Sequence, residues 1–168
     1  PTWFEIRASE KGYLGRKAGI DFMVAMNPQS YIQDVAEINP GGYLLYDSSW
    51  KREFHREDIN IIEVPLTSLC VDEFQNPKTR LLFKNLVYVG ALSYLMSIKK
   101  DIFIELIEEQ FKGKEKLIAP NVQALEMGFK YAKKHLVDAC DIKINQKNLT
   151  DGMILTNGNN AGGLGCVY

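Results

Sequence analysis

The order of elements in the first half of the chain constrains the fold most. DFMVAMN (21–27) is a short apolar run rich in strand formers, and the helical pattern PQSYIQDVAEI follows it, with Asn27 at the N-cap position. NPGG (39–42) ends this helix as a turn, and the strand-like runs YLLYD (43–47) and NIIEVP (60–65) come next. Strands that alternate with helices across short turns predict a parallel sheet of βαβ units.

The second half of the chain is helical in pattern. The segment 79–98 is apolar on almost every face, which predicts a buried helix. Asp101 can cap the next helix, and a third helix follows Pro120. We therefore expect a three-layer α/β fold with helices on both faces of a mostly parallel sheet. The expected strands are 22–26, 43–47 and 61–64, and the expected helices lie near 28–38, 79–98, 101–112 and 121–137.

In three of these helices, apolar side chains at helical spacing form a stripe on one face, and in the last of the three we expect that face to point inward. The stripes are Tyr31, Ile32, Val35 and Ile38; Ile102, Phe103, Leu106, Ile107 and Phe111; and Val122, Leu125, Phe129, Ala132 and Leu136. The helix over 79–98 differs, because it carries more apolar side chains than one sheet face can bury. Either part of it faces a neighbouring domain or a second copy of the chain, or it is enclosed within its own domain. The pattern fits both arrangements.

Composition excludes several classes of function. Lys and Arg number 20 against 21 Asp and Glu, a net charge of −1, so no bulk field recruits nucleic acid or an anionic membrane. No apolar run reaches the roughly 18 residues that a membrane span needs. Nothing at the N-terminus resembles a signal peptide. We therefore expect a cytoplasmic protein with no nucleic-acid or membrane partner.

The residues that most often hold metals are widely spaced. Cys70, Cys140 and Cys166 form no C-x-x-C pair, which fits neither a disulfide framework nor a zinc or iron–sulfur site, and we expect buried free thiols. His55 and His135 have no partner at ligand spacing, and surface positions are the simpler interpretation. The sequence therefore predicts no metal site.

Motifs for catalysis are also missing from the sequence. GNNAGGLG (158–165) has glycines but neither the G-K-[ST] of a phosphate-binding loop nor G-x-G-x-x-G, and close packing against a helix or strand is the alternative use of such glycines. The sequence also has no G-x-S-x-G nucleophile. A ligand site can still be predicted from the position of residues in the fold, because open α/β sheets bind ligands beyond the carboxyl ends of their strands. Asn27, Ser48 and Ser49 follow two such ends and are the candidate ligand-binding residues, with capping or turn formation as the alternative. No catalytic residue is predicted.

Several segments together resemble one family. DFMVAMNPQSY, PGGYLLYDSS and NLVYVGAL are similar, in this order, to segments of the gamma domain of 2-oxoacid:ferredoxin oxidoreductases. The patterns F111-x-x-K114 and N121-x-x-A124-x-x-x-G128 resemble its closing helices, so the match spans roughly residues 1–137. DGMILTNGNNAGGLG resembles the first strand and helix of the thiamine-diphosphate pyrimidine domain, which follows the gamma domain in the alpha subunits of 2-oxoglutarate-type enzymes.

The resemblance implies a domain division. A gamma-type α/β domain would occupy residues 1–147, and the beginning of the pyrimidine-binding domain residues 148–168. The gamma domain of this family opens with a glycine-rich turn that is not found here, and the first half of the expected sheet is missing. We therefore expect an N-terminally truncated piece of a longer polypeptide.

The resemblance also implies a function. The family oxidatively decarboxylates a 2-oxoacid, here 2-oxoglutarate, to its acyl-CoA and passes electrons to ferredoxin. Thiamine diphosphate, coenzyme A and iron–sulfur clusters are implied for the whole enzyme, and no cofactor is expected to be bound by this chain itself. The implied partners are a thiamine-diphosphate-binding beta subunit, the remainder of the alpha subunit and ferredoxin, in an oligomer.

This piece would serve assembly and the docking of coenzyme A, and we expect it to be inactive alone. A pyruvate- or indolepyruvate-type enzyme is an alternative within the family. A non-catalytic α/β ligand-binding or regulatory module is the alternative outside it.

Overall fold

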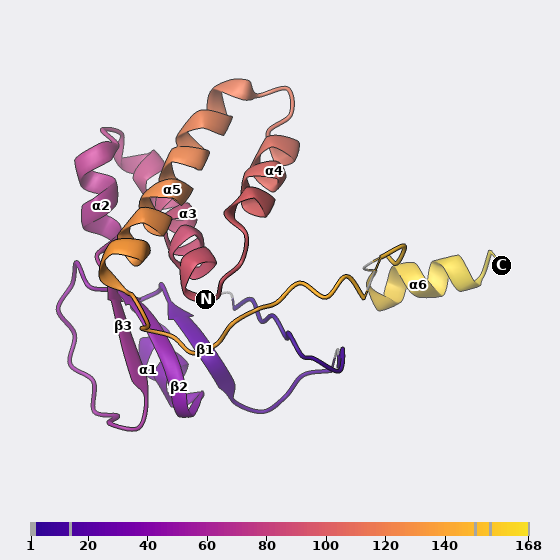
Figure 1. Cartoon of the computed structure of the whole chain (residues 1–168), viewed down its shortest axis with the longest axis horizontal. Helices are drawn as coiled ribbons and strands as arrows, with labels where there is room; N and C mark the ends of the chain where they lie inside the picture. The colour runs from indigo at the N-terminus through magenta and orange to yellow at the C-terminus, as the bar shows by residue number, and fades with distance from the viewer. Residues whose placement is uncertain (1–2, 14, 150, 155, 168) are drawn as a thin grey trace.

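The core of the molecule is a parallel sheet. The computed structural model describes residues 3–13, 15–149, 151–154 and 156–167. Its strands are β1 (Ile20–Ala25), β2 (Ile38–Asp47) and β3 (Asn60–Val64), in the order β1-β2-β3 (Figure 1). Both strand pairs are parallel, with Phe22 opposite Tyr43 and Leu45 opposite Ile62. The prediction of a parallel α/β sheet is confirmed.

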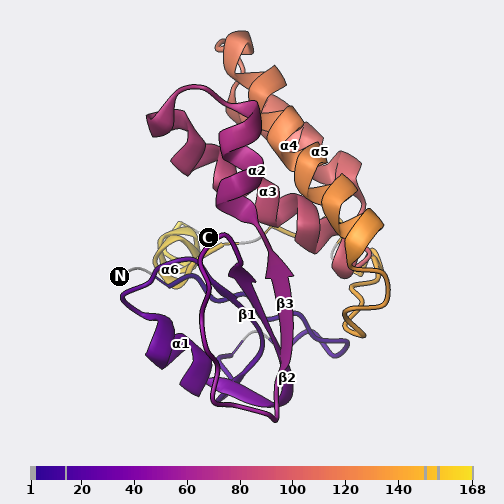
Figure 2. The same ribbon diagram turned by 90° about the vertical axis from the view of Figure 1, so that its left-hand side faces the viewer.

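Six α-helices and one 3₁₀ turn are described. They are α1 (Tyr31–Ala36), α2 (Leu66–Glu73), α3 (Pro77–Leu95), α4 (Lys100–Gln110), the 3₁₀ turn η1 (Glu115–Leu117), α5 (Ile118–His135) and α6 (Gly158–Gly165). Helices α2 to α5 gather at the end of the sheet where the strands finish, and α1 lies beside the sheet (Figure 2). The four expected helices are all present with shifted ends, and α2 is an element that the sequence did not predict.

The sheet is buried on both faces, which makes three layers. Leu44 and Ala25 pack on one face in a cluster that also contains Tyr31 of α1. Leu45 and Val64 point the other way and pack against α3 and α5, in a cluster that contains Val87 and Ala132. Strand β2 is central, so its successive side chains are buried on opposite faces of the sheet. This explains why the run YLLY is apolar without interruption.

Two glycines set the approach of α3 to α5. A Cβ on Gly90 would lie 1.9 Å from the carbonyl oxygen of Leu125, and a Cβ on Gly128 would lie 1.8 Å from that of Val87. Each helix thus presents a glycine to the backbone of the other. The two backbones can pack this closely only while neither position carries a side chain.

Helix α1 is shorter than expected. Its N-cap is Ser30, whereas the side chain of Asn27 accepts a hydrogen bond from the Gln29 amide at 3.0 Å within the preceding turn. Ile32 is 88% exposed, so it does not share the packed face of Tyr31 and Val35. Ile38 lies outside the helix because it starts β2, where it is buried and pairs with Ile20.

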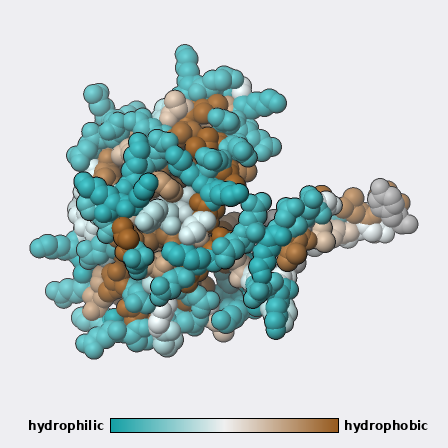
Figure 3. Space-filling view, viewed as in Figure 1, coloured by the Kyte–Doolittle hydropathy of each residue, from teal (hydrophilic) through white to brown (hydrophobic). Residues whose placement is uncertain are grey.

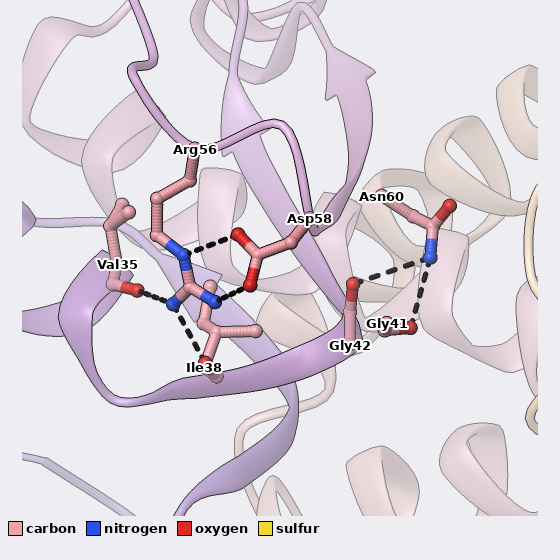
Figure 4. Close-up of polar contacts among 7 residues, drawn as sticks. All are labelled: Val35, Ile38, Gly41, Gly42, Arg56, Asp58 and Asn60. Carbon is pink, nitrogen blue, oxygen red and sulfur yellow. Dashed lines mark hydrogen bonds and ion pairs between the residues drawn. The ribbon is translucent and has the colours of Figure 1, made fainter.

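The segment NPGG is part of a strand rather than a plain turn. Strand β2 starts at Ile38 and carries an irregularity opposite Ile20–Phe22, where Gly41 takes a positive φ of 77°. The Gly41 amide donates to the Asp58 carbonyl at 2.7 Å. The Asn60 side chain donates to the Gly41 carbonyl at 2.9 Å (Figure 4). Contacts from Asp58 and from Asn60, the first residue of β3, therefore hold the part of β2 that precedes the predicted 43–47.

Residues 48–59, here called the strap, connect β2 to β3 without a helix. Arg52, Phe54 and Arg56 are half-buried, and the residues between them are exposed. The Arg56 guanidinium donates to the carbonyls of Val35 and Ile38, at 3.0 and 2.7 Å, and pairs with Asp58 (Figure 4). These contacts hold the strap across the C-terminal end of α1.

The helical layer corrects several predictions. Leu81 and Leu82 are 68% and 64% exposed, so α3 is not buried on all faces at its N-terminal end. Lys99 occupies the N-cap of α4, and Asp101 lies inside its first turn. On α4 the side chain of Ile107 is buried, whereas those of Ile102 and Leu106 are exposed. The stripe of α5 is confirmed at Leu125 and Ala132, which are fully buried; Val122, Phe129 and Leu136 are half-buried.

Helix α6 projects from the rest of the molecule (Figure 1). Every residue of Gly158–Gly165 is exposed, and Met153, Ile154 and Thr156 before it form no strand. Hydrophobic residues lie on the surface of this projecting segment (Figure 3), including Leu164, which is 47% exposed. Within the described ranges, no helix is long and apolar enough to cross a membrane.

Candidate functional site

The carboxyl ends of β1 and β2 border a small cavity, here called the strand-end cavity. Its volume is about 60 Å³. The lining residues come from both strand ends, the turn before α1, α1 itself, the strap and α3: Ala25, Met26, Asn27, Pro28, Tyr31, Asp47, Trp50, Arg52 and Lys84. This is the position at which open α/β sheets bind ligands.

Asp47, the last residue of β2, forms the polar centre of this edge. Its carboxylate accepts hydrogen bonds from the Ser49 and Thr67 amides at 3.2 Å each, and from the Thr67 hydroxyl. Lys84 of α3 lies 3.6 Å away and completes an ion pair in which both side chains are largely buried. Burial alone would raise the pKa of Asp47, but the hydrogen bonds from Thr67 and Ser49 outweigh it and hold the pKa below its usual value.

Arg52 and Tyr31 form the other side of the cavity. The guanidinium of Arg52 lies over the Tyr31 ring, 4.3 Å from its centroid, and Phe54 of the strap packs against the same ring. The Tyr31 hydroxyl is buried and has no hydrogen-bond partner among the described residues. Burial raises the pKa of Tyr31 well above its usual value, with Arg52 opposing, so the hydroxyl remains a proton donor at neutral pH.

The three candidate residues from the sequence have different surroundings. Asn27 lines the cavity, where its side-chain oxygen is occupied by the Gln29 amide. Ser49 is tied to the start of α2, because its hydroxyl accepts from the Ser68 amide at 2.9 Å. The Ser48 amide donates to the Val64 carbonyl at 3.0 Å, and neither serine lines the cavity.

Sequence reasoning missed Tyr31, Arg52 and Lys84. Lys84 is separated from Asp47 by 37 positions in the chain, and it is brought there only by the packing of α3 on the sheet. Arg52 lies in a charged loop that carries no helical or strand pattern. The available signal was the alternation of Arg52, Phe54 and Arg56, which in an extended segment places the three side chains on one side.

A larger hollow of about 630 Å³ lies at the opposite edge of the sheet, between the residues before β1 and those after α1. Its basic residues already have acidic partners: Arg16 pairs with Glu5 at 3.0 Å, and Lys17 with Asp21 at 3.9 Å. This hollow therefore offers fewer free charges than the strand-end cavity.

The cysteines do not fit an iron–sulfur cluster, which needs several converging thiolates. Cys70 and Cys140 are buried free thiols, as predicted, whereas Cys166 is exposed. Burial raises the pKa of the Cys70 thiol to about 11, which disfavours the thiolate. Both histidines are exposed, and no group of three potential metal ligands is found in the described parts of the chain.

The described lining residues of the strand-end cavity suit ligand binding. Among the described residues of its lining, no nucleophile lies beside a free general base, because the Asp47 carboxylate is engaged by Thr67, Ser49 and Lys84. Its basic side chains, an amide and a phenol suit the recognition of a ligand that carries acceptors.

Comparisons with known proteins agree with this fold. The family model described as pyruvate ferredoxin/flavodoxin oxidoreductase matches residues 1–131. The ketoisovalerate oxidoreductase subunit VorA of Methanothermobacter marburgensis is 26% identical over 118 residues, covering 69% of this chain and 24% of that protein. The VorA subunit of Methanothermobacter thermautotrophicus is 28% identical, with the same coverage. The chain thus spans about a quarter of the length of these curated relatives.

Two solved structures are also similar. The 2-oxoglutarate:ferredoxin oxidoreductase from Magnetococcus marinus, with 2-oxoglutarate, coenzyme A and succinyl-CoA bound, has a TM-score of 0.73 and 27% identity. The similarity covers 88% of this chain and 25% of that one. The gamma subunit of a keto/oxoacid ferredoxin oxidoreductase from Geobacter sulfurreducens shares the fold, with a TM-score of 0.55 and 21% identity over 68% of this chain and 64% of that one. The resemblance found in the sequence is confirmed: this chain belongs to the pyruvate ferredoxin/flavodoxin oxidoreductase family.

Proposed function

We propose that this chain is the gamma-type part of an enzyme that oxidatively decarboxylates a 2-oxoacid to its acyl-CoA and transfers the electrons to ferredoxin. The observation that carries this proposal is the family match over residues 1–131, together with relatives that are oxidoreductase subunits. Residues 1–147 form the gamma-type domain and residues 148–168 the start of a pyrimidine-binding domain. The enzyme is cytoplasmic.

We propose 2-oxoglutarate as the acid. The support is the similarity to the Magnetococcus marinus enzyme, which covers 88% of this chain and whose structure contains 2-oxoglutarate and succinyl-CoA. The branched acid ketoisovalerate is the second candidate, because the curated relatives are subunits of ketoisovalerate oxidoreductases. Turnover of the assembled enzyme with each acid separates the two.

Within this enzyme, the chain serves assembly and the docking of coenzyme A. Thiamine diphosphate and the iron–sulfur clusters belong to other parts, since the described cysteines do not converge on a cluster site. The partners are the thiamine-diphosphate-binding beta subunit, the remainder of the alpha subunit, and ferredoxin, in an oligomer. A non-catalytic ligand-binding module is the competing hypothesis.

Coenzyme A docks at the carboxyl edge of the sheet. Asn27, Ser48 and Ser49 follow the strand ends there, and Trp50 is 62% exposed at the rim of the strand-end cavity. An exposed indole offers a flat surface on which an adenine ring can stack, at a gain of about 1–3 kcal/mol. The neighbouring hydroxyl and amide groups can bind the polar parts of the same ligand.

The test uses the assembled enzyme with this chain in its alpha subunit, assayed for coenzyme A-dependent reduction of ferredoxin or viologen. We expect turnover with a 2-oxoacid by the assembly and none by the chain alone. Trp50→Ala should raise KM for coenzyme A about tenfold and leave KM for the acid unchanged, and Phe4→Ala, which removes another exposed aromatic ring, should change neither. Turnover by the isolated chain, or an assembly that oxidises no 2-oxoacid, would contradict the proposal.

A further inference from the structure

The strand-end cavity has unused hydrogen-bond donors, and the one carboxylate in its lining is already engaged. The only carboxylate in its lining, Asp47, accepts from Ser49 and Thr67 and pairs with Lys84. The Arg52 guanidinium has no hydrogen bond or ion pair with a described residue, and the Tyr31 hydroxyl has no partner among them either. A buried donor without a partner is costly, so such a cavity favours a ligand that brings acceptors.

The side-chain amide of Asn27 adds a further donor. Its oxygen accepts from the Gln29 amide at 3.0 Å, which orients the side chain and leaves its NH₂ group available. Lys84 neutralises Asp47 at 3.6 Å, so the positive charge of Arg52 is not cancelled within the lining. The cavity is therefore electrostatically suited to an anionic group.

Arg52 is held in position before any ligand arrives. Its guanidinium carbon lies over the Tyr31 ring, 4.3 Å from the ring centroid, and this contact restricts the side chain while its N–H groups remain able to donate hydrogen bonds to a ligand. The strap that carries it is anchored nearby by Phe54, which packs on Tyr31 and Tyr46, and by Arg56 at the end of α1 (Figure 4). Little side-chain entropy would be lost on binding.

The size of the cavity limits the ligand. A volume of about 60 Å³ corresponds to roughly two water molecules, which suits one carboxylate or phosphoryl group and is too small for a nucleotide. We propose that the strand-end cavity is an oxyanion subsite in which Arg52, Tyr31 and Asn27 bind a single carboxylate or phosphoryl group.

The identity of the anion rests on the proposed function, whereas the subsite itself does not. In that function, the anion is a phosphate of coenzyme A or a carboxylate of the 2-oxoacid. Both groups offer the same acceptor chemistry. In either case the rest of the ligand lies outside the cavity, past Trp50 at its rim.

The test measures anion binding by the full chain, with no need for turnover. Calorimetry with inorganic phosphate, 3′-phosphoadenosine 5′-diphosphate and 2-oxoglutarate, each at an ionic strength matched with chloride, reports on the site and on the source of the anion. Arg52→Gln should weaken binding about tenfold or more, since a hydrogen bond to a charged group is lost. The matched control is Lys51→Gln, which removes the same charge from an exposed neighbour and should leave binding unchanged.

Tyr31→Phe gives a second, independent variant. Because it removes a buried hydroxyl that has no partner, it should not lower the melting temperature, yet it should weaken anion binding several-fold. Tighter binding of the phosphorylated nucleotide than of phosphate would assign the subsite to coenzyme A, and tighter binding of 2-oxoglutarate would assign it to the acid. Binding of phosphate with no gain from either would support the subsite and separate it from the proposed function.

Three results would overturn the subsite: no binding of any of the three anions, equal losses in Arg52→Gln and Lys51→Gln, or full binding by Tyr31→Phe. None of these results changes the expected turnover by the assembled enzyme. The subsite and the proposed enzymatic function can therefore be refuted independently of each other.

Discussion

Replacing Gly128 of α5 by alanine should destabilise the protein strongly. The substitution adds only one methyl group, and alanine has a higher helix propensity than glycine. The new Cβ would lie 1.8 Å from the Val87 carbonyl oxygen and 3.0 Å from the Ala91 amide nitrogen, both of them backbone atoms of α3. Non-bonded heavy atoms are optimally separated by about 3.5–4.0 Å. No rotamer change can relieve such a contact, so α3 and α5 must move apart.

The magnitude follows from what lies between these helices. Val87, Ala91, Leu125 and Ala132 are all completely buried, and separating the helices by more than an ångström loosens their packing. Overpacking costs about 1–3 kcal/mol, and the partial exposure of one Val or Leu side chain adds up to about 1.5–3 kcal/mol. The higher helix propensity of alanine returns about 1 kcal/mol. The net loss is about 3 kcal/mol, a large share of the 5–15 kcal/mol that stabilises a typical domain.

Urea unfolding and thermal melting followed by circular dichroism measure this loss. A change of about 3 kcal/mol should lower the melting temperature by about 6–12 °C. Gly163→Ala is the matched control, because Gly163 is also helical and a Cβ there meets nothing within 4 Å; it should leave the main transition unchanged. Gly90→Ala should cost a similar amount, and the double variant less than the sum, since one separation of the helices accommodates both methyl groups. If Gly128→Ala unfolds at the same urea concentration as the wild type, the close helix contact is wrong.

Two further predictions concern Asp47 and the cysteines. Asp47→Asn should cost about 1–3 kcal/mol at neutral pH, because the buried amide and hydroxyl donors of Thr67 and Ser49 lose a charged acceptor. As the pKa of Asp47 is lowered in the folded state, its contribution is complete above the unfolded pKa of about 3.9 and disappears as the pH falls through the folded value. The free energies of unfolding of the two proteins should thus begin to converge as the pH falls below about 4; a constant difference down to pH 2 would contradict this cause. In the native protein, a thiol reagent should label Cys166 rapidly and should label Cys70 and Cys140 only on unfolding. Equal rates of labelling at all three cysteines would contradict the burial of Cys70 and Cys140.

The candidate site was only partly predictable from the sequence. The rule that ligands bind beyond the ends of parallel strands led to Asn27, Ser48 and Ser49, and Asn27 lines the cavity. Nothing in the local pattern pointed to Lys84, because the α3 residue reaches Asp47 only through helix packing. The side chains of Arg52 and Tyr31 meet for a similar reason, since the strap is folded back over α1.

Helix α2 illustrates the same limit. Its first turn is stabilised by Asp47, whose carboxylate accepts from the Thr67 amide at 3.2 Å although it lies 20 positions earlier in the chain. A helix cap is usually sought in the residue just before the helix, and here that residue is Pro65, which provides no side-chain cap. The element was therefore invisible to a local search for capping residues.

The sequence alone determined the fold class, the family and most of the secondary structure of this protein. The strand, helix and strand pattern over residues 21–47 predicts a parallel pair, and the apolar run YLLY marks its second strand. The tertiary structure alone decided the ends of the elements and the donors of the strand-end cavity. Both depend on contacts between residues far apart in the chain, such as Ile38 with Ile20 and Lys84 with Asp47, and local periodicity carries no information about such contacts.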